Sequence, residues 1–299
     1  MLSSIAKLSS MESFELYIFS FGFATFDICS LVARSVVIME FLLGSFLVFN
    51  LLHRFMKWIT AAFLAVFSIF LLWRLMAGDT ESCHCMGDIV DMNPTQSLIK
   101  NAFLAIMLGS MILGCLVGWI MLAFSWKTDR LAFKRQNLIA FLIAAVTTVV
   151  VFLICPPDFY YRNTSESNDL SQEAFRPVAD SLDLSEGRRI ICFYSATCEH
   201  CRHCASKMAG IIRRHDIPLD SVSVLFMQTH VAQDSVVTAF YAEHGDGLVL
   251  PYHDLHPFDF IPLTNGSMPL VTLFKDGNLI KEYDYLSLDE KELASFFNE

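Results

Sequence analysis

The fold of the second half of the chain is decided by the stretch Arg188-Arg-Ile-Ile-Cys-Phe-Tyr-Ser-Ala-Thr-Cys-Glu-His-Cys201. Its apolar run, Ile190–Tyr194, is typical of a strand buried on both faces. After Cys198 and Cys201, apolar and thiol side chains recur every three or four residues as far as Met208, as on one face of a helix. A Cys-x-x-Cys pair between a strand and a helix predicts a redox dithiol, because the helix N-terminus favours the thiolate of the first cysteine.

Other interpretations of this pair stay open. A zinc site would recruit His200, His203 and Cys204, and cysteines are also often inert residues of a core. We favour redox chemistry, because a strand, turn and helix in that order are not typical of a zinc ribbon. His200 is then a candidate site residue, since its protonated ring favours a neighbouring thiolate. Cys204 is expected to face the core, with a role as a third thiol as the alternative.

The end of the chain adds a strand, a turn and a second strand. Leu270–Phe274 and Leu279–Tyr285 flank an Asp-Gly pair, which is a hairpin signal, and Ser287 is the expected N-cap of a closing helix that runs to Phe297. Pro269 directly precedes the first of these strands.

Together with Cys198-Glu-His-Cys201, these features make residues 180–299 resemble the thioredoxin family. The resemblance implies that Cys198 is the nucleophile and Cys201 the resolving thiol. It also implies that Pro269 is cis and lies against the active disulfide. Two features depart from the family: Ala196-Thr197 replaces the usual aromatic residue before the first cysteine, and residues 245–263 read as an insertion.

The first half of the chain is predicted to lie in a membrane. Of the 299 residues, 54% are hydrophobic and only 17% are charged, and the apolar excess lies before Pro156. Four segments reach the roughly 20 residues that cross a bilayer: Ser30–Leu52, Trp58–Ala77, Leu98–Phe124 and Leu138–Cys155. The expected fold class is an all-α transmembrane helical bundle followed by an α/β thioredoxin-like domain. The net charge of −10, without a basic stripe, argues against nucleic-acid binding.

We therefore expect four parts. Residues 1–29 form an amphipathic N-terminal segment without a signal peptide, read as the tail of a missing transmembrane helix, and residues 30–155 form the membrane domain. Residues 156–183 are a linker, and residues 184–299 are the thioredoxin-like domain. The linker contains Pro156-Pro157 and a polar run, so we expect a flexible tether.

Loop charges predict the orientation. Residues 53–57 and 126–136 are basic, whereas residues 78–97 carry acids and neither Lys nor Arg. The positive-inside rule places the basic loops in the cytoplasm and the thioredoxin-like domain on the opposite side. We expect a multi-pass protein of the bacterial inner membrane with its C-terminal domain in the oxidising periplasm.

A second cysteine pair, Cys83-His-Cys85-Met-Gly87, lies on the outer acidic loop. Cys83 and Cys85 can form a small strained disulfide, which exchanges readily. The alternatives are a structural disulfide to Cys29 or Cys155, and a copper(I) site that includes His84 and Met86.

A second resemblance covers residues 9–124. The residues that carry it are Phe14-Glu15, Ala33-Arg34, Glu40 with Gly44, and Cys83-His-Cys85-Met-Gly87. This segment is similar to the MauE/DoxX family of redox-associated membrane proteins, which are four-helix bundles with a Cys-x-Cys loop. The resemblance implies electron transfer to or from disulfides at the membrane surface.

These motifs combine into one functional hypothesis, a thiol–disulfide oxidoreductase. Cys198/Cys201 would exchange electrons with Cys83/Cys85, in the oxidising direction and with a quinone as the electron sink. Arg34 and Glu40 are the candidate quinone-binding residues, because ionisable side chains inside a membrane indicate function. The duller alternatives are that Glu40 pairs with another helix and that Arg34 snorkels to the surface.

The expected partners are client protein thiols or disulfides, membrane lipid and a quinone, without nucleic acid. Two other functions stay open: a copper(I)-handling chaperone, and a membrane-anchored thioredoxin-like reductase.

Overall fold

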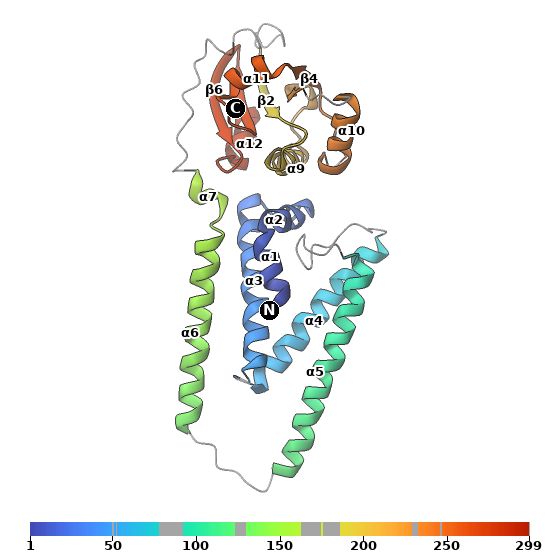
Figure 1. Cartoon of the computed structure of the whole chain (residues 1–299), viewed down its shortest axis with the longest axis vertical. Helices are drawn as coiled ribbons and strands as arrows, with labels where there is room; N and C mark the ends of the chain where they lie inside the picture. The colour runs from blue at the N-terminus through green and yellow to red at the C-terminus, as the bar shows by residue number, and fades with distance from the viewer. Residues whose placement is uncertain are drawn as a thin grey trace. The chain divides into compact units, whose positions relative to one another are not determined.

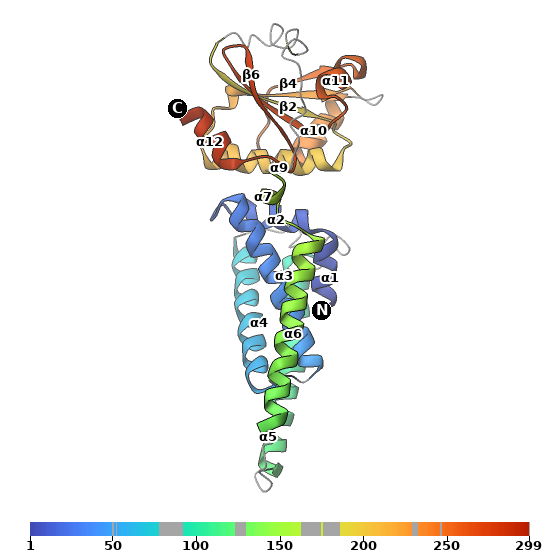
Figure 2. The same cartoon turned by 90° about the vertical axis from the view of Figure 1, so that its left-hand side faces the viewer.

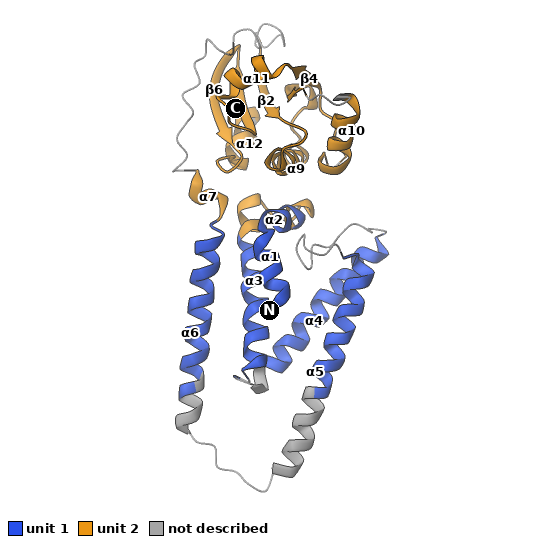
Figure 3. Cartoon of the chain, viewed as in Figure 1, with its two compact units in different colours: residues 1–17, 31–156 blue, residues 18–30, 157–299 orange. Residues whose placement is uncertain are grey.

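The computed structural model describes residues 1–49, 51, 53–77, 92–122, 130–162, 175, 186–228, 233–245 and 247–298, without the side chains of residues 53–55, 111–122, 130–134, 136 and 298. The chain divides into two compact units (Figure 3). The first consists of residues 1–17 and 31–156, and the second of residues 18–30 and 157–299. Residues 18–30, which precede the first long apolar stretch, therefore belong with the C-terminal half of the chain.

The first unit is built from helices (Figure 1). They are α1 (Leu2–Ser9), α2 (Met11–Ser20), α3 (Phe26–Val48), α4 (His53–Met76), α5 (Pro94–Leu122) and α6 (Arg130–Ile154). Helices α2 and α3 each begin in one unit and end in the other. Helices α4 and α5 pack along each other.

Three helical stretches in the described part of the chain are long and apolar enough to cross a membrane. They are Phe26–Val48, Met56–Met76 and Asn137–Ile154. Helix α3 therefore starts four residues before the expected span Ser30–Leu52, and it ends four residues before the end of that span. The expected span Leu98–Phe124 falls on α5, whose last turns carry side chains outside the described residues. Large apolar side chains such as Val66, Ile69 and Phe141 are exposed, as a lipid-facing surface requires.

The second unit contains a five-stranded sheet in the order β4-β3-β2-β5-β6. Strands β2 (Arg188–Tyr194), β3 (Val222–Met227) and β4 (Tyr252–Leu255) are parallel, and β5 (Leu270–Lys275) and β6 (Asn278–Asp284) add antiparallel pairs. The helices are α7 (Asp158–Tyr161), α9 (Glu199–Arg214), α10 (Gln233–His244), α11 (Pro257–Thr264) and α12 (Glu290–Asn298). This is the expected thioredoxin-like α/β fold, which is confirmed.

Strand β2 lies at the centre of the sheet, and its residues 190–194 are buried. Its side chains alternate between two cores. Ile191 and Phe193 pack with Phe260 and Leu263 of α11 on one face. On the other face, Tyr194 contacts α9 and α10, and Figure 2 shows α9 and α12 on the same side of the sheet. The central strand thus leads straight to the Cys-x-x-Cys turn at the start of α9.

Two local predictions near the C-terminus had different outcomes. The Asp276-Gly277 hairpin is confirmed, and both residues have the positive φ angles, 49° and 78°, that a tight two-residue turn requires. The helix start was predicted wrongly, because α12 begins at Glu290. The carboxylate of Asp289 accepts from the N–H groups of Lys291 (2.8 Å) and Glu292 (3.3 Å), so Asp289 caps the helix. Ser287 instead closes a turn with Asp284.

Candidate thiol–disulfide site

Cys198 and Cys201 lie where β2 ends and α9 begins. Cys198 is the N-cap of α9 and keeps an extended backbone, with φ −84° and ψ 124°. Its N–H donates to the carbonyl of Ser195 at 3.0 Å, which closes the turn after the strand. Cys198 is partly exposed, whereas Cys201, one turn along the helix, is fully buried. An incoming thiol or disulfide can therefore reach Cys198 first.

The surroundings of Cys201 suit a resolving thiol. Burial raises the pKa of the Cys201 thiol well above its usual range, and the N–H of Ser195 opposes this by donating to its sulfur at 3.3 Å. The neighbouring Cys198 thiol raises the pKa of Cys201 further. Cys201 therefore stays protonated at neutral pH, and the roles of Cys198 as nucleophile and Cys201 as resolving thiol stay predictions.

Cys204 repeats the three-residue spacing, but its geometry is different. Cys201 and Cys204 are both inside the helix, where Cβ atoms three residues apart are about 5–6 Å from each other. A disulfide needs Cβ atoms about 3.5–4.5 Å apart. Cys198 escapes this limit because its backbone is extended and not helical. This geometry favours Cys198 over Cys204 as the disulfide partner of Cys201.

Cys204 itself faces the core, where the hydroxyl of Tyr194 contacts its sulfur at 3.6 Å. Burial raises the pKa of Cys204 to about 11, while the Tyr194 hydrogen bond and the charge of Lys207 lower it. Burial likewise raises the pKa of Cys192, on the same face of β2, well above its usual range. Both thiols stay protonated near neutral pH, as inert core cysteines do.

Pro269 and His200 complete the site that the sequence predicts. The Met268–Pro269 peptide bond is cis, as the thioredoxin resemblance implies. Pro269 precedes Leu270, which pairs with Phe193. Pro269 therefore lies at the same end of the strands as the turn that leads to Cys198. The ring of His200 is exposed and lies against Tyr285, with centroids 5.1 Å apart. Sequence reasoning missed Tyr285, which follows the last strand and carries no motif.

The zinc interpretation of these thiols stays a prediction. Among the described residues, no group of three ligand atoms that includes Cys198 or Cys201 lies close enough together to hold one ion.

The second predicted centre, with Cys83, His84, Cys85 and Met86, lies outside the described residues. Its exchange chemistry and the copper(I) alternative therefore stay predictions. A structural disulfide from Cys83 or Cys85 to Cys29 or Cys155 likewise stays a prediction. The side chain of Cys115 also falls outside the described residues.

In the first unit, the Arg34 side chain is buried and its guanidinium is hydrogen-bonded to three acceptors. Its guanidinium donates to Glu15 at 2.5 Å and to the carbonyls of Cys155 (2.7 Å) and Pro156 (2.8 Å). The expectation that Arg34 snorkels to the surface is therefore wrong, because these three acceptors hold its charge inside the unit.

Glu40 pairs with another helix, as the duller alternative proposed. Its carboxylate accepts from Lys7 at 2.6 Å and from the Ser3 hydroxyl at 3.1 Å, both on α1. Gly44, one turn further along α3, lies against Met1, and a Cβ there would come within 2.7 Å of the Met1 side chain. The residues that carry the second resemblance thus join α3 to the N-terminal helices. A quinone role for Arg34 and Glu40 stays a prediction.

Comparisons with known proteins cover both halves of the chain. Residues 1–117 match the family model described as methylamine utilisation protein MauE. The chain is 23% identical over 341 residues to Protein TlpB of Flavobacterium psychrophilum. The alignment covers 95% of this chain and 87% of that protein. The MauE match confirms the resemblance inferred from the first half of the sequence, and it includes the Cys-x-Cys loop.

Two solved structures are similar to the C-terminal part. One is a secreted Mycobacterium tuberculosis disulfide oxidoreductase homologous to E. coli DsbE, with 10% identity, a TM-score of 0.30, and coverage of 39% of this chain and 84% of that one. The other is a DsbF homologue from Corynebacterium diphtheriae, with 13% identity, a TM-score of 0.30, and coverage of 39% and 73%. The geometry described above is that of a thiol–disulfide oxidoreductase site.

Proposed function

We propose that this chain is a membrane thiol–disulfide oxidoreductase in which the Cys198/Cys201 dithiol exchanges electrons with the Cys83/Cys85 pair. The observation that carries the proposal is the partly exposed Cys198 at the N-cap of α9, with the buried Cys201 one turn behind it. The MauE match supports the other half, because it includes the loop with Cys83 and Cys85.

In the oxidising direction, the Cys198–Cys201 disulfide first accepts two electrons from a client. One client thiolate attacks Cys198, which forms a mixed disulfide and releases Cys201 as a thiolate that takes up a proton. The second client thiol then loses its proton and attacks the mixed disulfide. The client leaves with a disulfide, and Cys198 and Cys201 are both reduced.

The pair is then reoxidised within the chain. The Cys198 thiolate attacks the Cys83–Cys85 disulfide and forms a mixed disulfide with one of its sulfurs. Cys201 loses its proton and attacks Cys198, which restores the Cys198–Cys201 disulfide and leaves the membrane pair reduced. Burial of Cys201 favours its protonated form, so we expect this second attack to be the slower step at neutral pH.

The oxidising direction rests on where the cysteines occur. The two basic loops, residues 53–57 and 126–136, contain no cysteine that could bring electrons from the cytoplasm. A quinone would then remove the electrons from Cys83/Cys85, with Arg34 and Glu40 as the candidate residues near its head group. The localisation that fits is the bacterial inner membrane, with the thioredoxin-like domain in the periplasm and client proteins as partners.

The test is to trap the intermediate. In a Cys201→Ser variant the mixed disulfide between Cys198 and Cys83 or Cys85 cannot be resolved, so it should accumulate as a cross-linked peptide in mass spectrometry. Cys204→Ser is the matched control, one turn away on the same helix, and should trap nothing. If replacing both Cys83 and Cys85 leaves client thiol turnover intact, the chain is a membrane-anchored thioredoxin-like enzyme without a relay.

A further inference from the structure

The C-terminal end of α9 is covered by chain segments that lie far away in sequence. Phe19 and Phe26 are buried and pack edge to face, with ring centroids 5.4 Å apart. The guanidinium of Arg214 lies over the Phe19 ring at 4.5 Å, and the ammonium of Lys207 lies over the Phe26 ring at 4.0 Å. This end of the helix is thus part of an interface within the second unit.

Glycine at position 210 makes the close approach possible. A Cβ built on Gly210 would come within 2.3 Å of the Phe19 ring, so no other residue fits unless the ring moves. Gly210 sits in the interior of α9, where glycine disfavours a helix relative to alanine. The contact with Phe19 gives a physical reason for this glycine.

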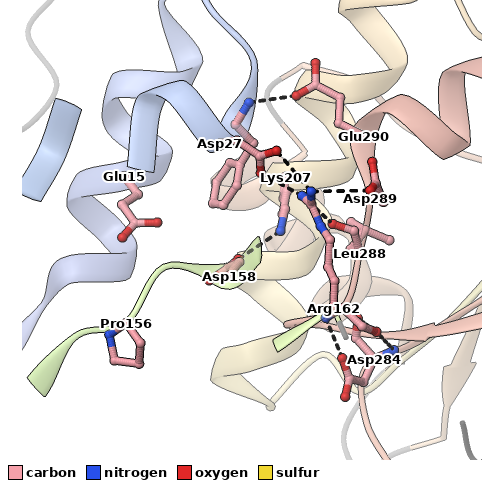
Figure 4. Close-up of polar contacts among 12 residues, drawn as sticks. Glu15, Asp27, Pro156, Asp158, Arg162, Lys207, Asp284, Leu288, Asp289 and Glu290 are labelled. Atoms are coloured by element: carbon pink, nitrogen blue, oxygen red, sulfur yellow. Dashed lines mark hydrogen bonds and ion pairs between the residues drawn. The ribbon is translucent and has the colours of Figure 1, made fainter. Parts of the chain in front are cut away.

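A buried ion pair joins a second segment, residues 157–162, to the same helix, and partly buried pairs join that segment to Asp27 and Asp289 (Figure 4). Lys207 is almost completely buried, and its ammonium pairs with the Asp158 carboxylate at 2.9 Å. Arg162, just after α7, donates to both Asp27 oxygens at 2.7 and 3.0 Å and pairs with Asp289 at 3.3 Å. Because a buried charge without its partner is costly, Lys207 requires residue 158 in place.

Glu290, the first residue of α12, connects the two ends of the chain. Its buried carboxylate accepts from the backbone N–H of Phe26 at 2.7 Å and from Arg214 at 2.9 Å. His215 lies 3.0 Å from the same carboxylate. Residues 18–30 therefore supply both apolar and polar contacts to α9 and α12.

We propose that residues 18–30 and 157–162 form a juxtamembrane clamp on α9. Residue 30 lies inside α3, so residues 18–30 continue directly into that long helix. Residue 157 comes three positions after Ile154, the last residue of α6. The clamp thus makes both connecting segments move with the redox helix. The clamp promotes exchange between Cys198 and the membrane cysteines, a consequence that rests on the function proposed above.

The sharpest test is Gly210→Ala in the full-length protein. Alanine raises the helix propensity of α9, so the helix keeps its structure, while the added methyl group displaces Phe19. Hydrogen exchange of the amides in residues 18–30 should accelerate by at least about tenfold. Gly109→Ala is the control, because Gly109 lies in a helix with open space around its Cβ position and should leave the exchange unchanged.

A second variant removes the ionic part. Asp27→Asn keeps the shape of the side chain and weakens its pair with Arg162, and it should accelerate exchange in residues 157–162 as well as in residues 18–30. The clamp is overturned if both segments already exchange like free peptides in the unmodified protein. It is also overturned if neither Gly210→Ala nor Asp27→Asn changes their exchange.

The proposed effect of the clamp on thiol exchange is measured separately. In the Cys201→Ser background, Gly210→Ala should slow formation of the mixed disulfide at least about fivefold, while the rate of Cys198 with dithiothreitol stays unchanged. If Gly210→Ala accelerates hydrogen exchange in the clamp but leaves the rate of mixed-disulfide formation unchanged, the clamp does not promote the exchange reaction. If the Cys201→Ser parent forms no adduct, the relay fails, and hydrogen exchange still decides the clamp.

Discussion

The two ends of α9 serve different purposes and are built differently. At its N-terminus, Cys198 has an extended backbone and a partly exposed thiol, and only Cys201 behind it is buried. At its C-terminus, Lys207, Gly210 and Arg214 are covered by aromatic rings and ion pairs from segments far away in sequence. One helix thus keeps its reactive end accessible while its other end is fixed. Variants at each end should therefore change different properties of the protein.

The largest effect is expected at the reactive end. Cys198→Ser removes the only partly exposed thiol of α9, so thiol exchange with a client should fall by at least about a thousandfold. Cys204→Ser, in the same helix, should leave exchange within about twofold, because that thiol faces the core. The measurement is the rate of reduction of a disulfide peptide. Equal losses in the two variants would show that the division between the accessible pair and the core thiol is wrong.

At the covered end, the expected loss is of stability. Asp158→Asn leaves the buried Lys207 ammonium without its carboxylate, which should lower the free energy of unfolding by about 3 kcal/mol. Glu292→Gln is the matched control, since Glu292 and Lys281 form an exposed pair that contributes about 0.5 kcal/mol or less. Thermal unfolding in detergent compares the two. A loss no greater than that of the control would contradict a structural role for the Lys207–Asp158 pair.

Between the two ends, Cys204 gives the smallest effect, and it depends on pH. Burial raises the pKa of its thiol from 9.0 to about 11, so the folded state holds this proton more tightly than the unfolded state. The contribution of Cys204 to stability is complete below pH 9, and it is lost as the pH rises through 11. Over that window the loss is about 2.5 kcal/mol.

Cys204→Ala should therefore flatten the alkaline decline of stability of the reduced protein. Unfolding would be followed at several values between pH 8 and 11, and the slope is what decides, since alanine also leaves a cavity. An unchanged slope would assign the alkaline decline to other buried groups, such as Cys201 and Tyr194, whose pKa values burial also raises.

Much of the fold was predictable from the sequence, because its signals are local. The apolar run 190–194, the Cys-x-x-Cys turn and the Asp276-Gly277 hairpin each specify structure within a few residues. The thioredoxin-like fold that these signals predict is confirmed, and the MauE resemblance, predicted from motifs in the first half of the chain, is confirmed too.

The clamp was not predictable, because its contacts join distant parts of the chain. Residues 18–30 read as the end of an amphipathic segment, and nothing near Phe26 in sequence announces that its N–H binds Glu290. Likewise, the acid Asp158 reads as an ordinary linker residue, although it neutralises a lysine 49 residues away. The helix start at Glu290 was also missed, since Ser287 and Asp289 are both residue types that cap helices, and Asp289 has the additional pair with the distant Arg162.

The hydrogen bond from Phe26 to Glu290 spans 264 positions, and this has a consequence for biosynthesis. A ribosome makes residue 26 long before residue 290. Residues 18–30 therefore cannot pack on α12 until residue 290 has been synthesised. During that interval the Phe19 and Phe26 rings lack part of the packing that buries them in the finished protein.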